Sequence, residues 1–442
     1  MIPAPGGVRA VRAARTPRHI AVVDLGFGDA GKGTVVDRLC ARARDEGRPI
    51  DTVVRFNGGA QAAHNVVTDD GRHHTFAQFG SGTFTPGTRT HLSRYMMVDP
   101  LALAAEADHL RGLGVVDPFA LLTVHRDAYL TTPYHAAANQ ARERARGDDR
   151  HGSCGMGVGE TAARALADPD RVPRARDCLS PIRLRRVLTG LRDAVIAEFG
   201  PLPMPEPGAC VEAFLGFGRA VRLVDDAYTH TLLRGRRVVF EGAQGVLLDE
   251  WHGFHPYTTW STTTFANVDA LAGGAGAEVY RLGVLRTYTT RHGAGPLPTE
   301  DAAATAALPD AHNGTGRWQG RFRVGHFDAV AHRYAVAACA GVDGLALTHT
   351  DVRLGEAGAR VGLGVVRAYE GRGPMVSPMP DLDHSARNTA LMLAARPVVE
   401  AAPGPREWPE FAAAELGTPV TLLSFGPRTR DKREARYYSS VT

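Results

Sequence analysis

Short apolar runs recur along the chain and alternate with Ala- and Leu-rich stretches that have a helical pattern. The runs that predict β-strands are Ile20–Leu25, Thr52–Phe56, Arg237–Phe240, Val279–Leu285, Gly344–Leu347 and Val420–Ser424. The stretches that predict helices include Pro100–Gly112, Pro181–Phe199 and Phe327–Ala340. This alternation is typical of an α/β protein, so we predict a mostly parallel central sheet flanked by helices.

Loops that carry polar and glycine residues follow most of these strands. Open parallel sheets bind ligands beyond the carboxyl ends of their strands, so these loops lie where a ligand is expected. Two polar segments are much longer than the others. We expect Gln140–Ser180 to be a long mobile insertion and Thr290–Arg323 to be a functional loop, because long loops in compact domains usually carry function.

The length and composition suit one large globular domain. The chain has 442 residues, of which 44% are hydrophobic and 22% are charged. We expect this domain to span residues 19–430. A flexible basic tail is expected at 1–18 and a C-terminal tail at 431–442.

Charge and cysteine usage exclude several classes of protein. The net charge is only +4 and the arginines are scattered, which gives no support for nucleic-acid binding. No apolar run reaches the ~18 residues that a membrane span needs, and no apolar core of a secretory signal follows the basic N-terminus. The five cysteines are widely spaced without a CxxC pair, which predicts reduced thiols in a cytoplasmic protein.

The segment between the first predicted strand and the next helix has the features of a phosphate-binding loop. It reads Gly26-Phe-Gly-Asp-Ala-Gly-Lys-Gly-Thr34, and its glycines allow backbone N–H groups to converge on phosphate oxygens. Gly33 stands where a Walker motif has a Mg²⁺-binding hydroxyl, so this is not a standard P-loop. Asp29 adds a carboxylate that can hold a metal ion or accept a proton.

Further candidates follow the other predicted strands. His64, in the Gly58–Asn65 segment, titrates near neutrality and can act as an acid or as a donor to phosphate, although a lone histidine is often an ordinary residue. Gln244, in Glu241–Gly245, can bind a base edge or a phosphate, or simply form a polar turn. Arg321 and Arg323 share one face of an extended segment and suit a carboxylate or phosphate, or a solvated strand edge.

Two late strand exits suggest a pocket for a base. Asp351 follows a buried strand, and a carboxylate there can accept from both N1–H and the 2-amino group of guanine, which adenine cannot supply. Ser424 and Gly426 follow the last strand and can line the same pocket. Taken singly, each of these segments is more typical of a capped turn, but together they point to GTP.

Seven motifs occur in one order along the chain. They are Gly-Asp-x-Gly-Lys-Gly, Gly-Gly-x-x-Ala-x-His, Glu-Gly-Ala-Gln-Gly, Thr-Arg-x-Gly-Ala-Gly-Pro-x-Pro-Thr-Glu, Gly-Arg-x-Arg, Thr-x-x-Asp-Val and Ser-x-Gly-Pro. This order resembles the adenylosuccinate synthetase family over about residues 19 to 430. The resemblance implies a ligase that uses GTP and Mg²⁺ to phosphorylate the 6-oxygen of IMP, after which the amine of aspartate displaces phosphate.

The resemblance also implies roles for individual residues. Asp29 would remove the N1 proton of IMP and bind Mg²⁺, His64 would stabilise the transferring phosphoryl group, and the carbonyl oxygen of Ala63 would bind Mg²⁺. The GTP site would comprise Gly28, Ala30, Gly31, Lys32, Gly33, Thr34, Arg323, His349, Asp351, Ser424 and Gly426. The substrate site would comprise Gln61, Cys154, Gln244, Thr259 and Arg321. A homodimer is implied, because one subunit lends an arginine to its partner; Arg164, Arg174 and Arg176 are candidates.

Departures from the family pattern concentrate in the loops that shape the substrate site. Ala60-Gln61 replaces His-Asn, and Cys154 replaces a hydroxyl in the Gly152–Glu160 loop, which the resemblance assigns to the phosphate of IMP. The loop that the resemblance assigns to aspartate, Gly314–Gln319, is longer and bulkier than expected, and His349 replaces a lysine beside guanine. The chain therefore resembles a divergent member of the family. Two alternatives stay open: the same chemistry on a modified purine nucleotide or with another amine, and a GTP-binding regulatory protein without catalysis.

Overall fold

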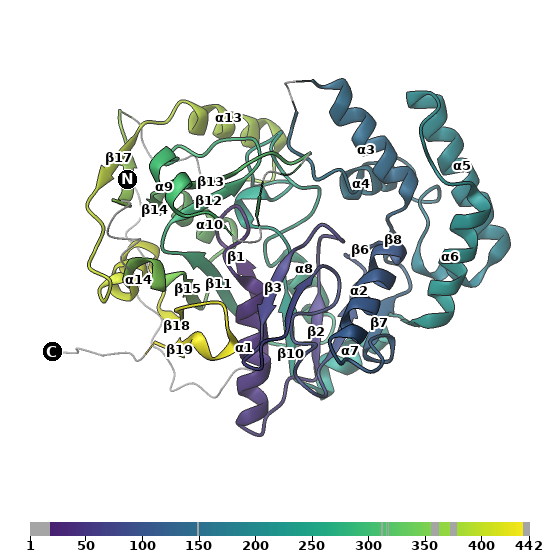
Figure 1. Ribbon diagram of the computed structural model, residues 1–442, viewed down its shortest axis with the longest axis horizontal. Helices are drawn as coiled ribbons and strands as arrows, with labels where there is room; N and C mark the ends of the chain where they lie inside the picture. The colour runs from purple at the N-terminus through teal and green to yellow at the C-terminus, as the bar shows by residue number, and fades with distance from the viewer. Residues whose placement is uncertain are drawn as a thin grey trace.

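The computed structural model describes residues 18–147, 150–310, 313, 314, 316, 318–354, 362–371 and 378–435. Its centre is a ten-stranded sheet in the order β19-β18-β15-β11-β1-β10-β2-β5-β7-β9 (Figure 1). All neighbouring strands of this sheet are parallel except β18 and β19. The predicted fold class is confirmed.

The elements have the following bounds. The strands of the main sheet are β1 (His19–Asp24), β2 (Thr52–Arg55), β5 (Arg89–Leu92), β7 (Leu122–His125), β9 (Arg222–Val224), β10 (Val238–Glu241), β11 (Tyr280–Arg286), β15 (Gly344–Thr348), β18 (Val420–Ser424) and β19 (Lys432–Glu434). The strands of smaller sheets are β3 (His64–Val67), β4 (His73–Phe76), β6 (Met97–Val98), β8 (Tyr129–Leu130), β12 (Thr289–His292), β13 (Phe322–Gly325), β14 (Phe327–Asp328), β16 (Val365–Tyr369) and β17 (Pro397–Glu400). The α-helices are α1 (Lys32–Asp45), α2 (Pro100–Gly112), α3 (Pro133–Ala145), α4 (Val158–Ala167), α5 (Pro181–Phe199), α6 (Pro207–Ala220), α7 (Asp226–Gly235), α8 (Ala266–Gly273), α9 (Ala302–Ala307), α10 (Ala329–Ala338), α11 (Thr350–Leu354), α13 (Leu382–Leu393) and α14 (Trp408–Leu416).

The six predicted strands are β1, β2, β10, β11, β15 and β18, and all lie in the main sheet. The helices α2 and α5 have the predicted bounds, because each begins with a capping side chain followed by proline. Asp99 accepts from the backbone N–H groups of Leu101 and Ala102, and Ser180 accepts from that of Arg183. The third predicted helix, Phe327–Ala340, is shorter in the structure, where α10 spans Ala329–Ala338. Phe327 and Asp328 instead form β14.

Three loop or tail assignments need correction. The expected insertion at 140–180 contains the end of α3, all of α4 and the 3₁₀ helix Ala175–Leu179. The expected loop at 290–323 contains most of β12, all of α9 and the start of β13. At the C-terminus β19 pairs with β18, so the sheet continues past the expected boundary at residue 430.

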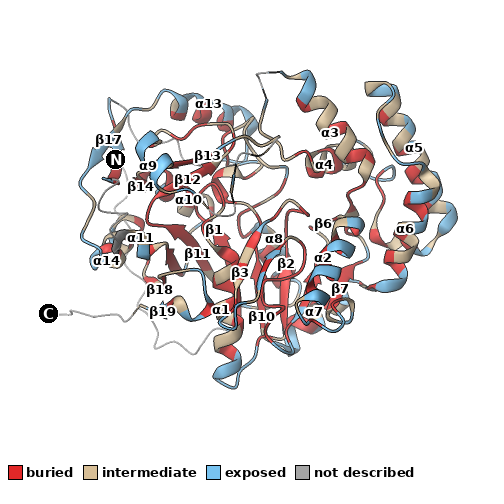
Figure 2. Cartoon of the chain, in the orientation of Figure 1, coloured by how far each residue is buried: buried red, intermediate tan, exposed pale blue. Residues whose placement is uncertain are grey.

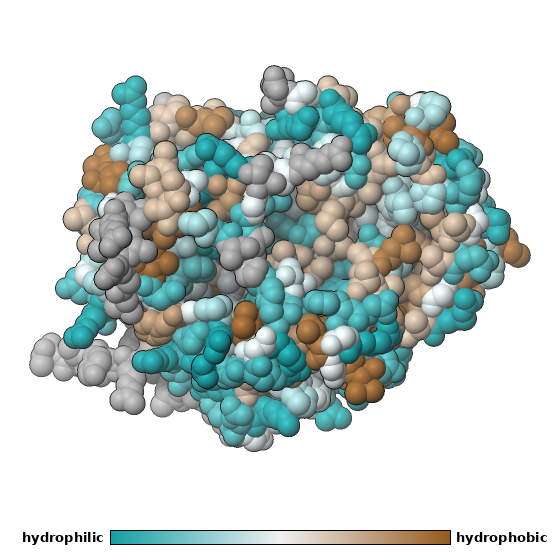
Figure 3. Space-filling view, viewed as in Figure 1, coloured by the Kyte–Doolittle hydropathy of each residue, from teal (hydrophilic) through white to brown (hydrophobic). Residues whose placement is uncertain are grey.

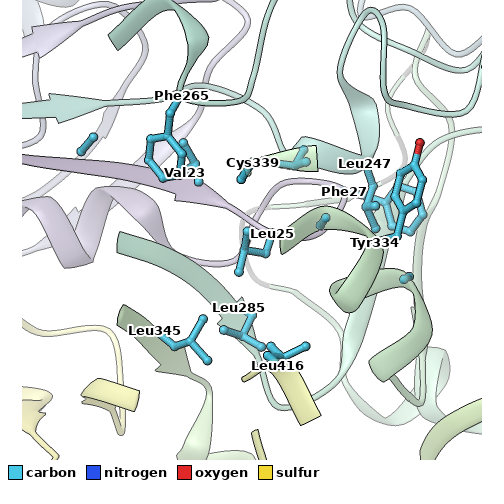
Figure 4. Close-up of a cluster of buried hydrophobic side chains, with 14 of the residues drawn as sticks. Val23, Leu25, Phe27, Leu247, Phe265, Leu285, Tyr334, Cys339, Leu345 and Leu416 are labelled. Atoms are coloured by element: carbon cyan, nitrogen blue, oxygen red, sulfur yellow. The ribbon is translucent and has the colours of Figure 1, made fainter. Parts of the chain in front are cut away.

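Four apolar clusters occur among the described residues, and the two largest join most of the elements. Figure 2 shows that the central strands are buried along their length. Figure 4 shows the larger cluster, in which Val23 of β1 lies beside Phe265, while Leu25, which follows β1, lies nearer to Leu285 of β11 and Leu345 of β15. A second cluster joins the ends of β5 and β7 to α2, α5 and α6, which lie with α3 and α4 on the right of Figure 1. The strand ends between these clusters are therefore rigidly supported.

The surface, the helices and the cysteine thiols have the following features. On the face in Figure 3, the most hydrophobic residues are scattered among hydrophilic ones. Within the described ranges, we find no helix with both the length and the apolar character of a membrane span. All five cysteines are free thiols.

Candidate active site

The carboxyl ends of the parallel strands surround a pocket of about 300 Å³. Its walls are loops that follow β1, β2, β10, β11, β15 and β18, which is where an open parallel sheet binds ligands. The predicted residues that line it are Gly28, Asp29, Gly31, Lys32, Gly33, Thr34, Gln61, Ala63, His64, Gln244, His349, Asp351, Ser424 and Gly426. Residues scattered over most of the sequence therefore meet in one cavity.

The phosphate loop is organised by Asp24, the last residue of β1. Its carboxylate accepts from the backbone N–H groups of Gly26 and Ala30, both at 2.8 Å, and from Nζ of Lys32 at 3.2 Å. Gly28 and Asp29 adopt positive φ angles of 92° and 61°. Sequence reasoning missed the role of Asp24 because it ends an apolar strand and belongs to no motif.

Two glycines allow the loops around the pocket to touch. A Cβ atom on Gly33 would lie 2.7 Å from Cβ of His64, so a side chain at the Walker hydroxyl position would push β3 off α1. A Cβ atom on Gly245 would lie 2.2 Å from the carbonyl oxygen of Gly26 and 2.3 Å from the nitrogen of Gly28. Backbone packing thus explains why the Walker pattern is broken here.

His64 forms a buried pair with Glu241, the last residue of β10. Nδ1 of His64 lies 2.6 Å from Oε1 of Glu241, and Oε2 of Glu241 accepts from the backbone N–H of Ser81 at 2.9 Å. Burial lowers the pKa of His64 to about 4, despite the attraction of Glu241. Burial opposes ionisation of Glu241, but Arg55 and His64 outweigh it and hold the pKa of Glu241 at about 2. The carboxylate therefore fixes Nδ1 as a donor and leaves Nε2 for a ligand.

Asp29 lies on the wall next to β11. Burial raises the pKa of its carboxyl, an effect that Arg286 and Lys32 oppose. Nε of Arg286 donates to the backbone carbonyl of Asp29 at 2.8 Å. A carboxylate with a raised pKa accepts a proton more readily than an exposed one, which suits a general base.

The base end of the pocket is built by β15, α11 and β18. Oγ1 of Thr350 donates to the carbonyl of Ser424 at 2.6 Å, and Oγ of Ser424 donates to the carbonyl of Gly426 at 3.2 Å. Nζ of Lys432 also donates to the carbonyl of Gly426, at 3.0 Å. Asp351 is exposed, and partial burial of its carboxyl raises its pKa. Lys432, which was assigned to the tail, therefore supports this wall.

Five predicted residues do not line the pocket: Ala30, Cys154, Thr259, Arg321 and Arg323. Both arginines bind Glu300, each at 2.8 Å, which confirms that they share one face. Arg321 keeps 67% of its side chain exposed, whereas Arg323 keeps 11% and also donates to the carbonyl groups of Gly293 and Gly295. The carboxylate they hold in this structure is the chain's own.

The loop expected to hold a substrate phosphate packs against the longer loop opposite. Trp318 packs against Gly155: a Cβ atom on Gly155 would lie 2.8 Å from Cδ1 of Trp318. The guanidinium carbon of Arg144 lies 5.1 Å from the centre of the Trp318 ring. Oγ of Ser153 donates to Oδ1 of Asn139 at 2.8 Å. Thr315 and Arg317 of the opposite loop lie outside the described residues.

The three candidate partner arginines all contact their own chain. Arg164 binds Glu198 at 2.6 Å, Arg174 donates to the hydroxyl of Tyr129 at 2.6 Å, and Arg176 pairs with Asp127. None of the three lines the pocket.

The pocket also contains residues that sequence reasoning missed. They include Arg286, His292, Asp310, Asn313 and Gln319. Arg286 could have been noticed as a charged residue ending an apolar strand. The others lie in the long segment at 290–323, where no local pattern fixes the path of the chain.

Comparisons with known proteins identify the family of this chain. The family model of adenylosuccinate synthetase matches residues 21–431. An adenylosuccinate synthetase of Anaeromyxobacter sp. (strain K) is 35% identical over 373 residues, which cover 82% of this chain and 83% of the relative. That of Myxococcus xanthus (strain DK1622) is 34% identical over 386 residues, covering 84% and 85%.

Two solved structures share the fold. The fully ligated adenylosuccinate synthetase of Plasmodium falciparum has a TM-score of 0.77 at 19% identity and covers 94% of this chain and 99% of its own. The succinoaminodeoxyadenylate synthetase of cyanophage S-2L, bound to dGMP and to dATP as energy donor, has a TM-score of 0.61 at 20% identity, covering 96% and 97%. The family match over most of the chain, together with the bacterial relatives, shows that this chain belongs to the adenylosuccinate synthetase family.

Proposed function

We propose that this chain uses GTP to phosphorylate the 6-oxygen of IMP and then joins aspartate to carbon 6, giving adenylosuccinate, GDP and phosphate. Family membership makes the chain a carbon–nitrogen ligase of purine biosynthesis that binds GTP, which removes the alternative of a regulatory protein without catalysis. The proposal adds the residues that carry the reaction.

One observation carries the proposal: Asp29 and His64 line the same pocket as the phosphate loop. Asp29 would accept the N1 proton of IMP, so that negative charge develops on the 6-oxygen. His64 would donate from Nε2 to the phosphoryl group during transfer, because the charge of that group favours the protonated ring. Glu241 would hold His64 in this orientation through the bond at Nδ1.

GTP would occupy the length of the pocket. The backbone of Gly28–Thr34 and the amine of Lys32 would hold its phosphates. The carboxylate of Asp351, with Ser424 and Gly426, would hold guanine. His349 would contact the base as a neutral ring, since burial lowers its pKa far below the ordinary value.

Mg²⁺ fits the donors that the pocket offers. Asp29 and Ala63 both line it, and a carboxylate and a carbonyl oxygen are the ligands this ion prefers. Within the described residues no group of three acidic, histidine or cysteine side chains gathers for a metal, which suits an ion that keeps waters and nucleotide phosphates as its other ligands. When bound, Mg²⁺ would neutralise charge on the phosphates.

We further propose a homodimer in a reducing, cytoplasmic compartment. Free thiols at all five cysteines support the compartment. Support for the dimer comes from the family resemblance alone.

A direct assay tests the proposal. Purified protein is incubated with GTP, Mg²⁺, IMP and aspartate, and phosphate release and the mass of the nucleotide product are followed. We expect one adenylosuccinate per phosphate. Phosphate release without a nucleotide of that mass would contradict the proposal, and Asp29→Asn serves as the inactive control.

A second candidate reaction uses another amine or a modified purine nucleotide. It is favoured by Trp318 and Gln319, whose bulk occupies the loop that the resemblance assigns to aspartate; Gln319 lines the pocket. The same assay with alternative amines and nucleotides decides between the two. A catalytic efficiency above ~10⁴ M⁻¹s⁻¹ with IMP and aspartate, unmatched by any analogue, would exclude this candidate.

A further inference from the structure

The guanidinium of Arg286 touches both sides of the pocket. Arg286 ends β11, which lies between β1 and β15 in the sheet, and only 5% of the residue is exposed. It belongs to none of the seven motifs, and neither the family resemblance nor the proposed function gives it a role.

On one side Arg286 holds the phosphate loop. Nε donates to the backbone carbonyl of Asp29 at 2.8 Å, and Nη2 donates to the same oxygen. Two N–H groups on one carbonyl fix the direction of that peptide plane. Asp29 adopts a φ of 61°, which is uncommon for a residue with a side chain. Such a conformation persists only where surrounding contacts hold it, and the bonds from Arg286 are contacts of this kind.

The next carbonyl of the loop is held in the same way. Oγ1 of Thr348, the residue paired with Arg286 across β11 and β15, donates to the carbonyl of Ala30 at 2.7 Å. The backbone N–H of Ala30 donates to Asp24. The peptides on both sides of Ala30 are therefore oriented by the ends of three strands, which sets the direction of the Asp29 carboxylate.

On the other side Arg286 holds the segment after α9. Nη2 donates to Oδ2 of Asp310 at 3.1 Å, and both side chains are largely buried. Asp310 itself lines the pocket, as do Asn313 and Gln319 farther along the chain. Nη1 donates to the hydroxyl of Tyr288 at 3.0 Å, which keeps the guanidinium plane in place.

We propose that Arg286 is a positioning residue that clamps the phosphate loop at Asp29 to the Asp310 segment, so that the two pocket walls keep one relative position. Arg286 bonds the backbone of Asp29 and acts through it; it is not assigned contact with the reacting atoms. The catalytic consequence rests on the proposed role of Asp29. The mechanical coupling of the two segments does not, so it is tested separately.

The first test measures backbone hydrogen exchange in the full chain for the wild type, Arg286→Met and Arg286→Lys. The clamp predicts faster exchange in two separate peptides of Arg286→Met, one containing Asp29 and one containing Asp310. The matched control is Arg281→Met, since Arg281 lies on the same strand and pairs with Asp269 at 2.8 Å but is not a pocket residue. The control should leave both peptides at the wild-type rate.

The second test measures kcat and KM for GTP separately in the same variants. Misplacing a reacting group by about 1 Å costs on the order of 10²-fold in rate, so kcat of Arg286→Met should fall about a hundredfold while KM for GTP stays within about threefold. Lysine can reach some but not all of these acceptors, so kcat of Arg286→Lys should lie between those of the wild type and Arg286→Met. If Arg286→Met does not fold, Arg286→Lys is measured in its place.

These outcomes decide the inference. Exchange that rises in neither peptide of Arg286→Met, or in only one, overturns the coupling; so does an equal rise in Arg281→Met. A kcat within threefold of the wild type overturns the catalytic consequence. If the wild type makes no adenylosuccinate, the proposed function fails, while the exchange result still decides whether Arg286 couples the two walls.

Discussion

The phosphate-loop side of the pocket and the opposite side are fixed by different means. Around Gly26–Thr34, loops after β1, β2 and β10 touch through glycine backbones and share buried hydrogen bonds to Asp24 and Glu241. Between the loops at 152–157 and 318–320, the closest approach to a glycine comes from a side chain, that of Trp318 against Gly155. The residues assigned to the chemistry therefore lie among close backbone contacts, where substitution is sterically costly, while the two loops that shape the substrate site touch through a side chain that can repack.

The largest effect is expected at the side chain that gives the phosphate-loop side its chemistry. Asp29→Asn keeps the shape of the carboxyl but cannot accept a proton, so kcat should fall by about 10²–10⁴ with little change in GTP affinity. Steady-state kinetics and equilibrium binding of GTP measure the two quantities. A kcat within about tenfold of the wild type would contradict the role of Asp29.

Next in size is a backbone contact on the same side. In Gly245→Ala the new methyl group would overlap the carbonyl oxygen of Gly26, so the phosphate loop must move, and kcat/KM should fall about a hundredfold. The control is Gly190→Ala in α5, where nothing lies within 4 Å and helix propensity favours alanine by roughly 0.5–1 kcal/mol. Unaltered activity in Gly245→Ala would show that this contact is not required.

Acid should lower the free energy of unfolding of the whole chain, and so affect both sides of the pocket together. Buried histidines have lowered pKa values of about 4 for His19, His64 and His125 and about 3 for His91 and His135, in each case mainly because burial opposes their charge. The unfolded chain binds protons at these positions below about pH 6.5 while the folded chain does not, so stability is full above pH 6.5 and is lost as the pH falls toward 4. Each pKa unit corresponds to about 1.4 kcal/mol.

Buried carboxyl groups offset part of this loss. Burial raises the pKa of Asp37 and Asp328 to about 6 and also raises that of Asp29, Asp99, Glu250 and Asp351, and a raised carboxyl pKa adds stability as the pH falls. Burial also lowers the pKa of His332 and His349, and the pKa of Glu241, held at about 2, adds to the loss in acid. The free energy of unfolding by urea should therefore still decrease from pH 7 to pH 4.5. A constant or rising value would contradict these shifts.

A smaller change is expected at the base end. Asp351→Asn replaces one acceptor oxygen with a donor, so the preference for GTP over ATP should fall about tenfold. Competition between the two nucleotides in the phosphate-release assay measures the ratio of kcat/KM. A wild type that uses both equally would refute the assignment of Asp351, and Ser424→Ala tests the same wall independently.

The smallest effect is expected on the opposite side. Cys154 does not line the pocket, and burial raises the pKa of its thiol, so Cys154→Ser should change kcat/KM for IMP by less than about threefold. A tenfold change would show that the loop at 152–157 binds the nucleotide directly, and the contrast between the two sides would then lose its basis.

The sequence predicted those parts of the molecule that local patterns determine. The six strands, the bounds of α2 and α5, and the meeting of Asp29 with His64 follow from apolar runs, capping residues and the rule for parallel sheets. The residues that hold these side chains and loops in place could not be predicted from such patterns. Asp24, Glu241 and Arg286 act through contacts between strands that are distant in sequence, and a sequence pattern does not state which strands are neighbours.

The longer polar segments were predicted less well. Helix α4 and parts of the paired strands β12 and β13 lie in segments that were expected to be loops because the segments as a whole are long and polar, although tertiary packing overrides such propensities. The roles of Thr259 and Arg323 came from resemblance alone. The structure places neither in the pocket wall, so their assignments remain proposals.

In the proposed reaction, the phosphate-loop side activates the 6-oxygen of the purine by phosphorylation. Isotope transfer tests this step: IMP labelled with ¹⁸O at position 6 is incubated with GTP, Mg²⁺ and aspartate, and the label is followed by mass spectrometry. We expect each released phosphate to carry one ¹⁸O atom and the product to carry none. Unlabelled phosphate formed along with adenylosuccinate would contradict it.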